Sequence, residues 1–196
     1  SDVYKRQAYK FNSSLDMRMN TSSSLTAINV VNEYTEKELS DVFFYYGDFK
    51  DSKKIAKQIF NKRNEKEIIS TYDLVAALEG LFSEKNKNKY LARIFQAIRI
   101  EVNDEINSLK KLLNDATELL NSEGRLVVIS YHSLEDRLVK NLINKGSIDG
   151  KSNQDFFGKV TKIYTPINKR VIIPNDEESK KNKRSRSAKL RIAEKI

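Results

Sequence analysis

The sequence predicts an α/β fold in which a largely helical first half is followed by part of a doubly wound, parallel-type sheet. Apolar residues recur at helical spacing through much of residues 35–120, which indicates packed helices. The run LVVI at 126–129 is apolar without alternation, as is typical of a strand covered on both faces. A helical pattern follows directly from residue 133. The chain offers few partners for such a strand, so we expect only part of the sheet to lie within these residues.

Length and composition exclude several classes of protein. A chain of 196 residues can form one core, or one core plus a small subdomain. No apolar run approaches the roughly 20 residues of a membrane span, so we expect no membrane partner. The lack of cysteine excludes disulfides and thiolate metal sites and fits a reducing, cytoplasmic location. A single histidine argues against a histidine-rich metal site, so we expect no bound metal.

The net charge of +9 is concentrated at the end of the chain. Residues 180–196 hold eight Lys or Arg and one Glu, a net charge of +7, which leaves +2 for residues 1–179. A basic segment on a nearly neutral body predicts local contact with a polyanion. A solvated, disordered terminus is the alternative interpretation.

The first clear helix is predicted over residues 35–46. Thr35 is its expected N-cap, and Glu38 stands where it completes a capping box. Gly47 follows the helical pattern and predicts its end, because glycine adopts the left-handed conformation common after helices.

Two further helices follow. Residues 51–63 form the first of them, since Ile55 and Ile59 share one face. Thr71 is expected to cap the next, over residues 71–82, whose leucines recur at helical spacing.

One long helix is then predicted from about Tyr90 to Leu120, because apolar residues recur at intervals of three and four throughout. Gln96, Arg99 and Asn103 are spaced so that they share another face of it. These three side chains form either a solvated stripe or a polar face capable of forked hydrogen bonds.

A strand over 125–130 leads into a helix over 133–144. Ser133 is the expected N-cap of this helix, with Asp136 in the capping-box position. Further strands are expected at 159–165, at 170–173 and at 188–194.

His132, the only histidine, lies at the junction between this strand and helix. In open α/β sheets ligands bind beyond the carboxyl ends of strands, and helix N-termini favour anions. For His132, Glu135 and Arg137 this position leaves a functional and a purely structural role equally open. For Ser133 the structural role is favoured.

Four segments together resemble the bacterial 16S ribosomal RNA cytosine-N4 methyltransferase family. The resemblance extends over residues 9–196, with small departures at Asn20, Tyr131 and Lys183. One such segment is weakly specific, whereas four in the family's order are highly specific. The segments are LDMRMN at 15–20, FQAIRIEVN at 95–103, GRLVVISYHSLEDR at 124–137 and NKRSRSAKLRIAEK at 182–195.

The resemblance implies a Rossmann-like class I methyltransferase sheet with an all-α insertion domain. It places a segment leading out of the methyltransferase domain at 1–24, the substrate-recognition insertion at 25–105, and the rest of the methyltransferase domain, closed by a basic hairpin, at 106–196. The cofactor implied is S-adenosylmethionine. Its glycine-rich loop has no match here, so the cofactor-binding residues are expected upstream of this chain, and the chain alone is expected to be inactive.

The implied reaction transfers a methyl group to the exocyclic N4 of a cytidine in the decoding centre of 16S ribosomal RNA, within the small ribosomal subunit. This amine is a weak nucleophile, so the reaction needs in-line placement and an acceptor for the charge that develops on nitrogen. Asp16 and Glu135 are the candidate catalytic residues, whereas Asp136 is expected to be occupied as a helix cap. Candidate residues for RNA or substrate contact are Arg18, Gln96, Arg99, Asn103, His132, Arg137, Arg184, Arg186, Lys189 and Arg191.

Arginine usage supports this list, because the chain holds 25 Lys and only 11 Arg, yet each of the four segments contains arginine. The planar guanidinium suits phosphate, carboxylate and base stacking. Arg18 and Arg99 are equally compatible with buried ion pairs that lock the insertion in place. His132 is assigned to shaping the pocket, because methyl transfer to an amine does not require a histidine base.

Two other functions remain open from sequence alone. One is a non-catalytic RNA- or ribosome-binding module with a basic tail. The other is a methyltransferase that acts on a different acceptor, such as DNA or a small molecule.

Overall fold

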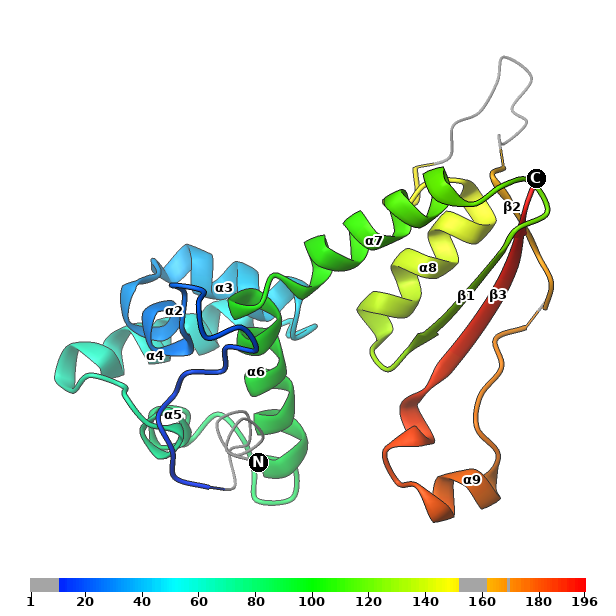
Figure 1. Ribbon diagram of the computed structural model, residues 1–196. Coiled ribbons are helices and arrows are strands. Elements are labelled where there is room, and N and C mark those ends of the chain that lie inside the picture. The colour runs from blue at the N-terminus through cyan, green and yellow to red at the C-terminus, as the bar shows by residue number, and fades with distance from the viewer. Residues whose placement is uncertain (1–10, 152–161, 169) are drawn as a thin grey trace. The chain divides into compact units, whose positions relative to one another are not determined.

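The computed structural model describes residues 11–151, 162–168 and 170–196, and the chain divides into two compact units. Unit 1 extends from Ser1 to Glu105, and unit 2 from Ile106 to Ile196 (Figure 1). Among the described residues, no helix combines the length and the apolar character needed to cross a bilayer.

Unit 1 is helical, and capping boxes set the start of three of its helices. Thr35 and Glu38 form the predicted box at the start of α3, so this prediction is confirmed. The predicted cap at Thr71 is wrong by one residue, because Ser70 and Asp73 form the box of α5. Thr71 is instead buried, and its hydroxyl donates to the carbonyl oxygen of Phe11. The helices are α2 (Ala27–Glu33), α3 (Glu36–Tyr45), α4 (Ser52–Glu65), α5 (Thr71–Ala77) and α6 (Lys87–Val102).

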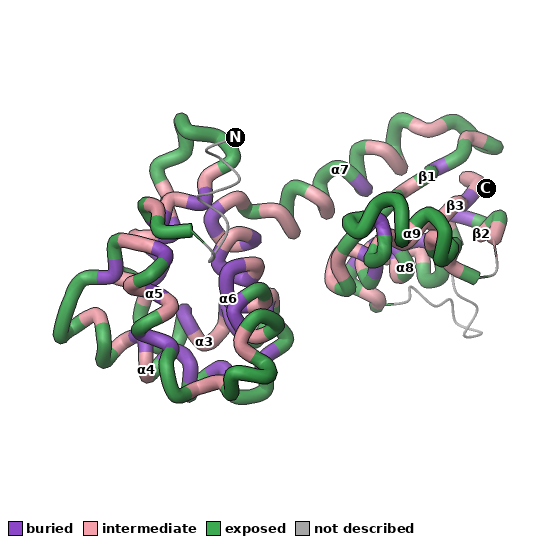
Figure 2. Tube along the Cα trace, turned by 90° about the horizontal axis from the view of Figure 1, so that it is seen from below, coloured by how far each residue is buried: buried purple, intermediate pink, exposed green. Residues whose placement is uncertain are grey.

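Helix α6 passes through the core of unit 1, and Figure 2 shows buried residues concentrated along it. Seven of its sixteen residues are buried. Leu15 and Met17, which precede α2, belong to the same core. The structure thus places segment 11–24 in unit 1.

The prediction of a single helix over 90–120 is wrong. Helix α6 ends at Val102, and a separate helix, α7 (Glu105–Leu119), begins after two intervening residues. Asp104 adopts a left-handed conformation with φ of 48°. The cause is tertiary: the Asn103 side chain hydrogen-bonds backbone groups of Met17 and Met19. Apolar periodicity continues across the break, so the sequence pattern does not reveal it.

Unit 2 is a three-stranded antiparallel sheet with helices packed on one face. The strand order is β1-β3-β2, so β1 lies at an edge among the described strands. The short β2 strand pairs antiparallel with β3. This pairing confirms the expected hairpin between the strands predicted at 159–165 and 188–194. Residues 159–161 of the first predicted strand lie outside the described part of the chain. Besides α7, the elements are β1 (Arg125–Ser130), α8 (Ser133–Lys145), β2 (Tyr164–Pro166), α9 (Asp176–Lys181), η1 (Ser185–Ser187) and β3 (Lys189–Lys195).

The two faces of this sheet differ in burial. On the inner face, Leu126 and its partner Ala193 pack against apolar residues of α7 and α8. On the outer face, Val127 and Ile129 are 58% and 57% exposed. Within the described residues β1 pairs antiparallel and has one face covered, so the predicted coverage of both faces is not found here, and the doubly wound sheet stays a prediction.

Candidate functional site

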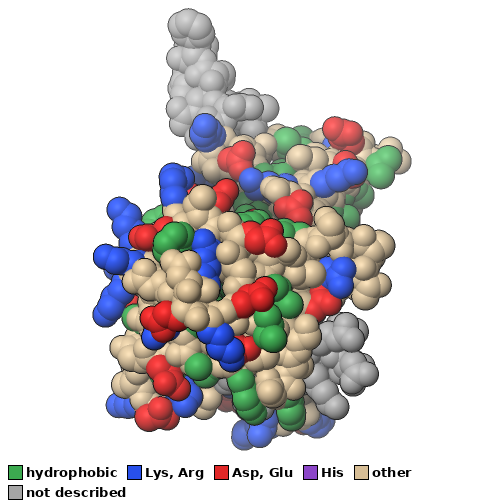
Figure 3. Space-filling model, turned by 90° about the vertical axis from the view of Figure 1, so that its left-hand side faces the viewer, with side chains coloured by type: hydrophobic (Ala, Val, Ile, Leu, Met, Phe, Trp, Pro, Cys, Tyr) green, Lys and Arg blue, Asp and Glu red, His purple; other side chains and the backbone are tan. Residues whose placement is uncertain are grey.

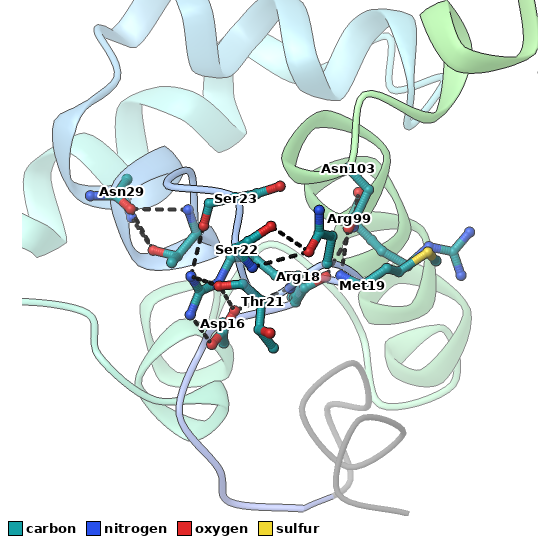
Figure 4. A network of polar contacts seen from close by, with 12 residues as sticks. Asp16, Arg18, Met19, Thr21, Ser22, Ser23, Asn29, Arg99 and Asn103 are labelled. Carbon is teal, nitrogen blue, oxygen red and sulfur yellow. Dashed lines mark hydrogen bonds and ion pairs between the residues drawn. The ribbon is translucent and has the colours of Figure 1, made fainter.

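The segment LDMRMN forms a tight loop in unit 1 around an ion pair between Asp16 and Arg18 (Figure 4). Both carboxylate oxygens of Asp16 accept from the guanidinium of Arg18, at 2.7 Å from Nε and 2.9 Å from Nη2. The remaining terminal nitrogen of Arg18 donates to the carbonyl oxygens of Thr21 and Ser23. The guanidinium thus closes the loop upon itself. Met17, between the two, holds a left-handed φ of 61° and is buried.

Asn103 fixes the same loop from α6. Its Oδ1 accepts from the backbone nitrogen of Met19 at 2.7 Å, and its Nδ2 donates to the carbonyl oxygens of Met17 and Arg99 at 2.9 and 2.8 Å (Figure 4). All the polar atoms of the amide are therefore engaged, and the side chain is a bridge between distant segments.

Arg99 forms a forked ion pair with Glu105, at 2.8 and 3.1 Å, across the break between α6 and α7. Gln96, which shares its helix face, is half-buried. Of the predicted polar face, Arg99 and Asn103 thus have structural partners within the chain.

In unit 2, the strand–helix junction contains a capping box displaced by one residue from the prediction. His132, not Ser133, is the N-cap of α8, and its Nδ1 accepts from the backbone nitrogen of Leu134 at 3.3 Å. Glu135, not Asp136, returns the bond: its Oε2 accepts from the backbone nitrogens of Tyr131 and His132 at 2.9 and 3.1 Å. Because Nδ1 accepts, the neutral ring carries its proton on Nε2.

Asp136 has a different role from the predicted cap. It lies 8% exposed beneath β3, where Arg191 and Lys189 both contact its carboxylate. Burial would raise the pKa of Asp136, but hydrogen bonds from these two cations outweigh it and hold that pKa below its usual value. Two of the predicted RNA-binding residues therefore have an ion-pair partner inside unit 2. Residues 189 and 191 are two positions apart on one strand and so share a face. That spacing is the sequence signal from which a common partner could have been predicted.

Other basic residues of the same prediction are on the surface. Arg137 and Arg186 are exposed and form no ion pair within the described residues. Arg184 is also exposed, at the start of the turn η1. The structure therefore distinguishes these exposed side chains from Lys189 and Arg191, which pair with the buried Asp136.

The predicted residues thus form separate groups within each unit. In unit 1, Asp16 and Arg18 are linked directly, and Asn103 bonds the backbone beside them. In unit 2, Asp136 joins α8 to β3, while His132 and Glu135 order the start of α8.

Comparison with known proteins decides the family. The model of the MraW methylase family matches residues 4–196. The chain belongs to this family. The resemblance seen in the four motifs is thereby confirmed.

Curated relatives carry a consistent name. The ribosomal RNA small subunit methyltransferase H of Parabacteroides distasonis is 48% identical over 189 residues, 96% of this chain and 62% of the relative. The protein of that name from Flavobacterium johnsoniae is 48% identical over 187 residues, 95% of this chain and 62% of the relative. The one from Azobacteroides pseudotrichonymphae is 47% identical over 195 residues, 100% of this chain and 64% of the relative. The chain thus spans less than two thirds of the length of these relatives.

Proposed function

We propose that this chain is part of an S-adenosylmethionine-dependent methyltransferase that modifies the exocyclic N4 of a cytidine in the decoding centre of 16S ribosomal RNA. The observation that carries the proposal is membership of the MraW methylase family over residues 4–196. The names of its relatives, ribosomal RNA small subunit methyltransferases, support the substrate class. Because that substrate belongs to the small ribosomal subunit, we place the activity in the cytoplasm.

The finer fold that we propose is a doubly wound sheet completed by other parts of the protein. Its support is the outer face of β1, where Val127 and Ile129 are more than half exposed. Burial is worth about 25 cal/mol per Å² of apolar surface, so an open aliphatic face favours a covering layer. Helices cover both faces in doubly wound sheets, and β1 offers a strand edge for further pairing.

Glu135 is the better placed of the two proposed catalytic carboxylates. Its Oε2 atom accepts two backbone hydrogen bonds, whereas its Oε1 atom has no partner among the described residues. Because the Oε2 bonds hold the carboxylate in place, the Oε1 atom can accept a hydrogen bond from an amine that gains positive charge during methyl transfer. In Asp16, by contrast, both oxygens accept from Arg18. For Asp16 to act, Arg18 would first have to release it, so the two residues would work as a pair.

The proposed RNA contacts divide according to their exposure. Arg137, Arg184 and Arg186 are exposed, and a guanidinium at the surface suits phosphate or a base. Lys189 and Arg191 would orient this surface through Asp136. Arg18, Gln96, Arg99 and Asn103 would act by holding the LDMRMN loop and the end of α6 in place. His132 would shape the pocket beside Glu135.

Nucleoside analysis tests the proposal. We expect disruption of the gene that encodes this chain to remove N4-methylated cytidine from 16S ribosomal RNA, as measured by mass spectrometry of nucleosides. Loss of a different methylated nucleoside would favour a methyltransferase that acts on a different acceptor. An unchanged set of methylated nucleosides would contradict a catalytic role and leave the non-catalytic RNA-binding module as the explanation.

A further inference from the structure

Unit 1 carries a group of exposed lysines that none of the four motifs includes. We call them the lysine corner: Lys50, Lys53, Lys54 and Lys57 at the start of α4, and Lys89 at the start of α6. None of the five forms an ion pair within the described part of the chain, whereas Lys37, Lys62 and Lys66 of the same unit each have an acidic partner. Figure 3 shows that Lys and Arg side chains are numerous on the face that it views, including a group along one margin.

The corner has a net positive charge. Five lysines contribute +5, and the neighbouring Asp48 and Asp51 contribute −2, so the local balance is +3. Beyond its N-cap Asp51, α4 has no acidic residue in its first turn, whereas Lys53 and Lys54 lie at its N-terminal end. Cations at a helix N-terminus interact unfavourably with the helix dipole. A local arrangement that costs stability is expected where binding requires it.

The loop between α3 and α4 holds these lysines on a rigid support. Arg93 donates from two nitrogens to the carbonyl oxygen of Gly47, at 3.0 and 2.6 Å. Its guanidinium lies 4.1 Å from the centre of the Phe49 ring. Gly47 is required in this turn, because a Cβ atom there would approach that ring to 2.5 Å. Lys89 lies one helical turn before Arg93, which places it on the same face of α6.

The other end of the support is fixed as well. Gln58, one turn after Lys54, donates to the carbonyl oxygens of Ala77 and Glu79, both at 2.8 Å. The Phe49 ring packs edge-on against Tyr90, with centroids 5.0 Å apart. The corner thus has fixed backbone geometry and exposed ammonium groups on flexible stems of four carbons, which suits the irregular spacing of phosphates along a single strand.

We propose that the lysine corner binds phosphates of the RNA substrate as a second contact, separate from the basic C-terminal segment. The proposal rests on the proposed function for the choice of RNA as partner. The chemistry is recognition of a polyanionic backbone without base specificity, in which each neutralised phosphate releases condensed counterions.

The test is the salt dependence of RNA affinity, measured by fluorescence anisotropy with a short labelled single-stranded RNA and the whole 196-residue chain. The test variant combines Lys50→Gln, Lys54→Gln and Lys57→Gln. We expect affinity to fall about tenfold or more, and the slope of log affinity against log salt to decrease by about 2, since each lost phosphate contact on a single strand is worth about 0.7. The corresponding triple substitution to Arg should restore the slope.

Matched variants separate the possible outcomes. Lys37→Gln with Lys62→Gln removes paired lysines of unit 1, and Arg184→Gln with Arg186→Gln alters the C-terminal segment. An unchanged slope in the corner variant, while the C-terminal variant loses slope, would overturn the lysine corner alone. An equal loss per charge in the Lys37 and Lys62 control would also overturn it, because the effect would then be general charge. A wild-type chain without salt-dependent RNA binding would contradict both this inference and RNA recognition by the chain.

Discussion

Arg191 on β3 donates hydrogen bonds to both carboxylate oxygens of Asp136 on α8, at 2.7 Å from Nε to Oδ1 and 3.2 Å from Nη2 to Oδ2. The two side chains are only 18% and 11% exposed. This forked pair joins the last strand to the first turn of α8 on the inner face of the sheet. A residue that sequence reasoning assigned to RNA is therefore a structural element of unit 2, and its substitution should affect folding first.

The stability of this pair should depend on pH. A folded-state pKa below the unfolded value of about 3.9 means that Asp136 contributes stability above that value and loses it as pH falls through the folded pKa. We expect the unfolding free energy of the wild type to drop more steeply below about pH 4 than that of Asp136→Asn. Urea titrations at several pH values would measure it. Parallel profiles for the two proteins would contradict the assignment.

Arg191→Ala and Arg186→Ala should have different effects. Loss of the Arg191 fork leaves a mostly buried carboxylate with one cation fewer, so we expect about 2 kcal/mol of destabilisation. Arg186 is exposed, so its removal should leave the melting temperature nearly unchanged and lower the salt slope of RNA binding by less than about one unit. Differential scanning calorimetry and anisotropy titrations separate the two effects. The reverse result would return Arg191 to the RNA-binding group.

His132→Ala should destabilise α8 by about 1 kcal/mol, because the N-cap acceptor for Leu134 is lost. His132→Asn keeps a side-chain acceptor at the cap and should recover most of this loss. Circular dichroism melts would compare the two variants. If both are equally stable but RNA binding falls in each, the ring itself contacts the substrate and capping is secondary.

Asn103→Asp should weaken the LDMRMN loop while leaving one of its bonds in place. The carboxylate can still accept from the backbone nitrogen of Met19, but it cannot donate to the carbonyl oxygens of Met17 and Arg99. We expect faster hydrogen exchange at residues 16–23 and a loss of about 2 kcal/mol. Gln96→Glu, on the same helix face, is the charge-matched control. Equal exchange in both variants would show that the loop does not depend on Asn103.

The 196-residue chain should not bind S-adenosylmethionine measurably. Doubly wound folds hold such cofactors through a glycine-rich loop after an early strand, and the six glycines here form no such motif. Titration calorimetry of the chain with the cofactor measures this directly. Micromolar affinity would show that a complete cofactor site lies within these residues and would contradict the expectation that its binding residues lie elsewhere.

Local signals predicted several elements well. Thr35 and Glu38 marked the start of α3, because a capping box depends only on neighbouring residues. The residues of β3 were expected within one position, at 188–194 against the observed Lys189–Lys195. A capping box is set within a few residues of the chain and does not depend on distant partners.

Features set by distant partners were missed. The break after α6 depends on hydrogen bonds between Asn103 and a loop 84 and 86 residues away in sequence. The N-cap of α8 is a local feature that was also missed: serine has a strong intrinsic preference for N-caps and Ser133 was predicted, whereas the chain uses His132 with Glu135. The pairing of Asp136 with β3 likewise joins positions more than 50 residues apart.

The edge position of β1 has a consequence for the self-association and solubility of the chain. An edge strand with an aliphatic outer face can pair with a strand of another molecule. Val127 and Ile129, which share the outer face of β1, would then form part of an apolar face on the extended sheet. Where no further layer covers this edge, self-association through it should grow with concentration and set an upper limit on solubility. Handling of the purified chain, and its turnover by cellular quality control, would then be governed by one short strand and not by the far larger helical unit.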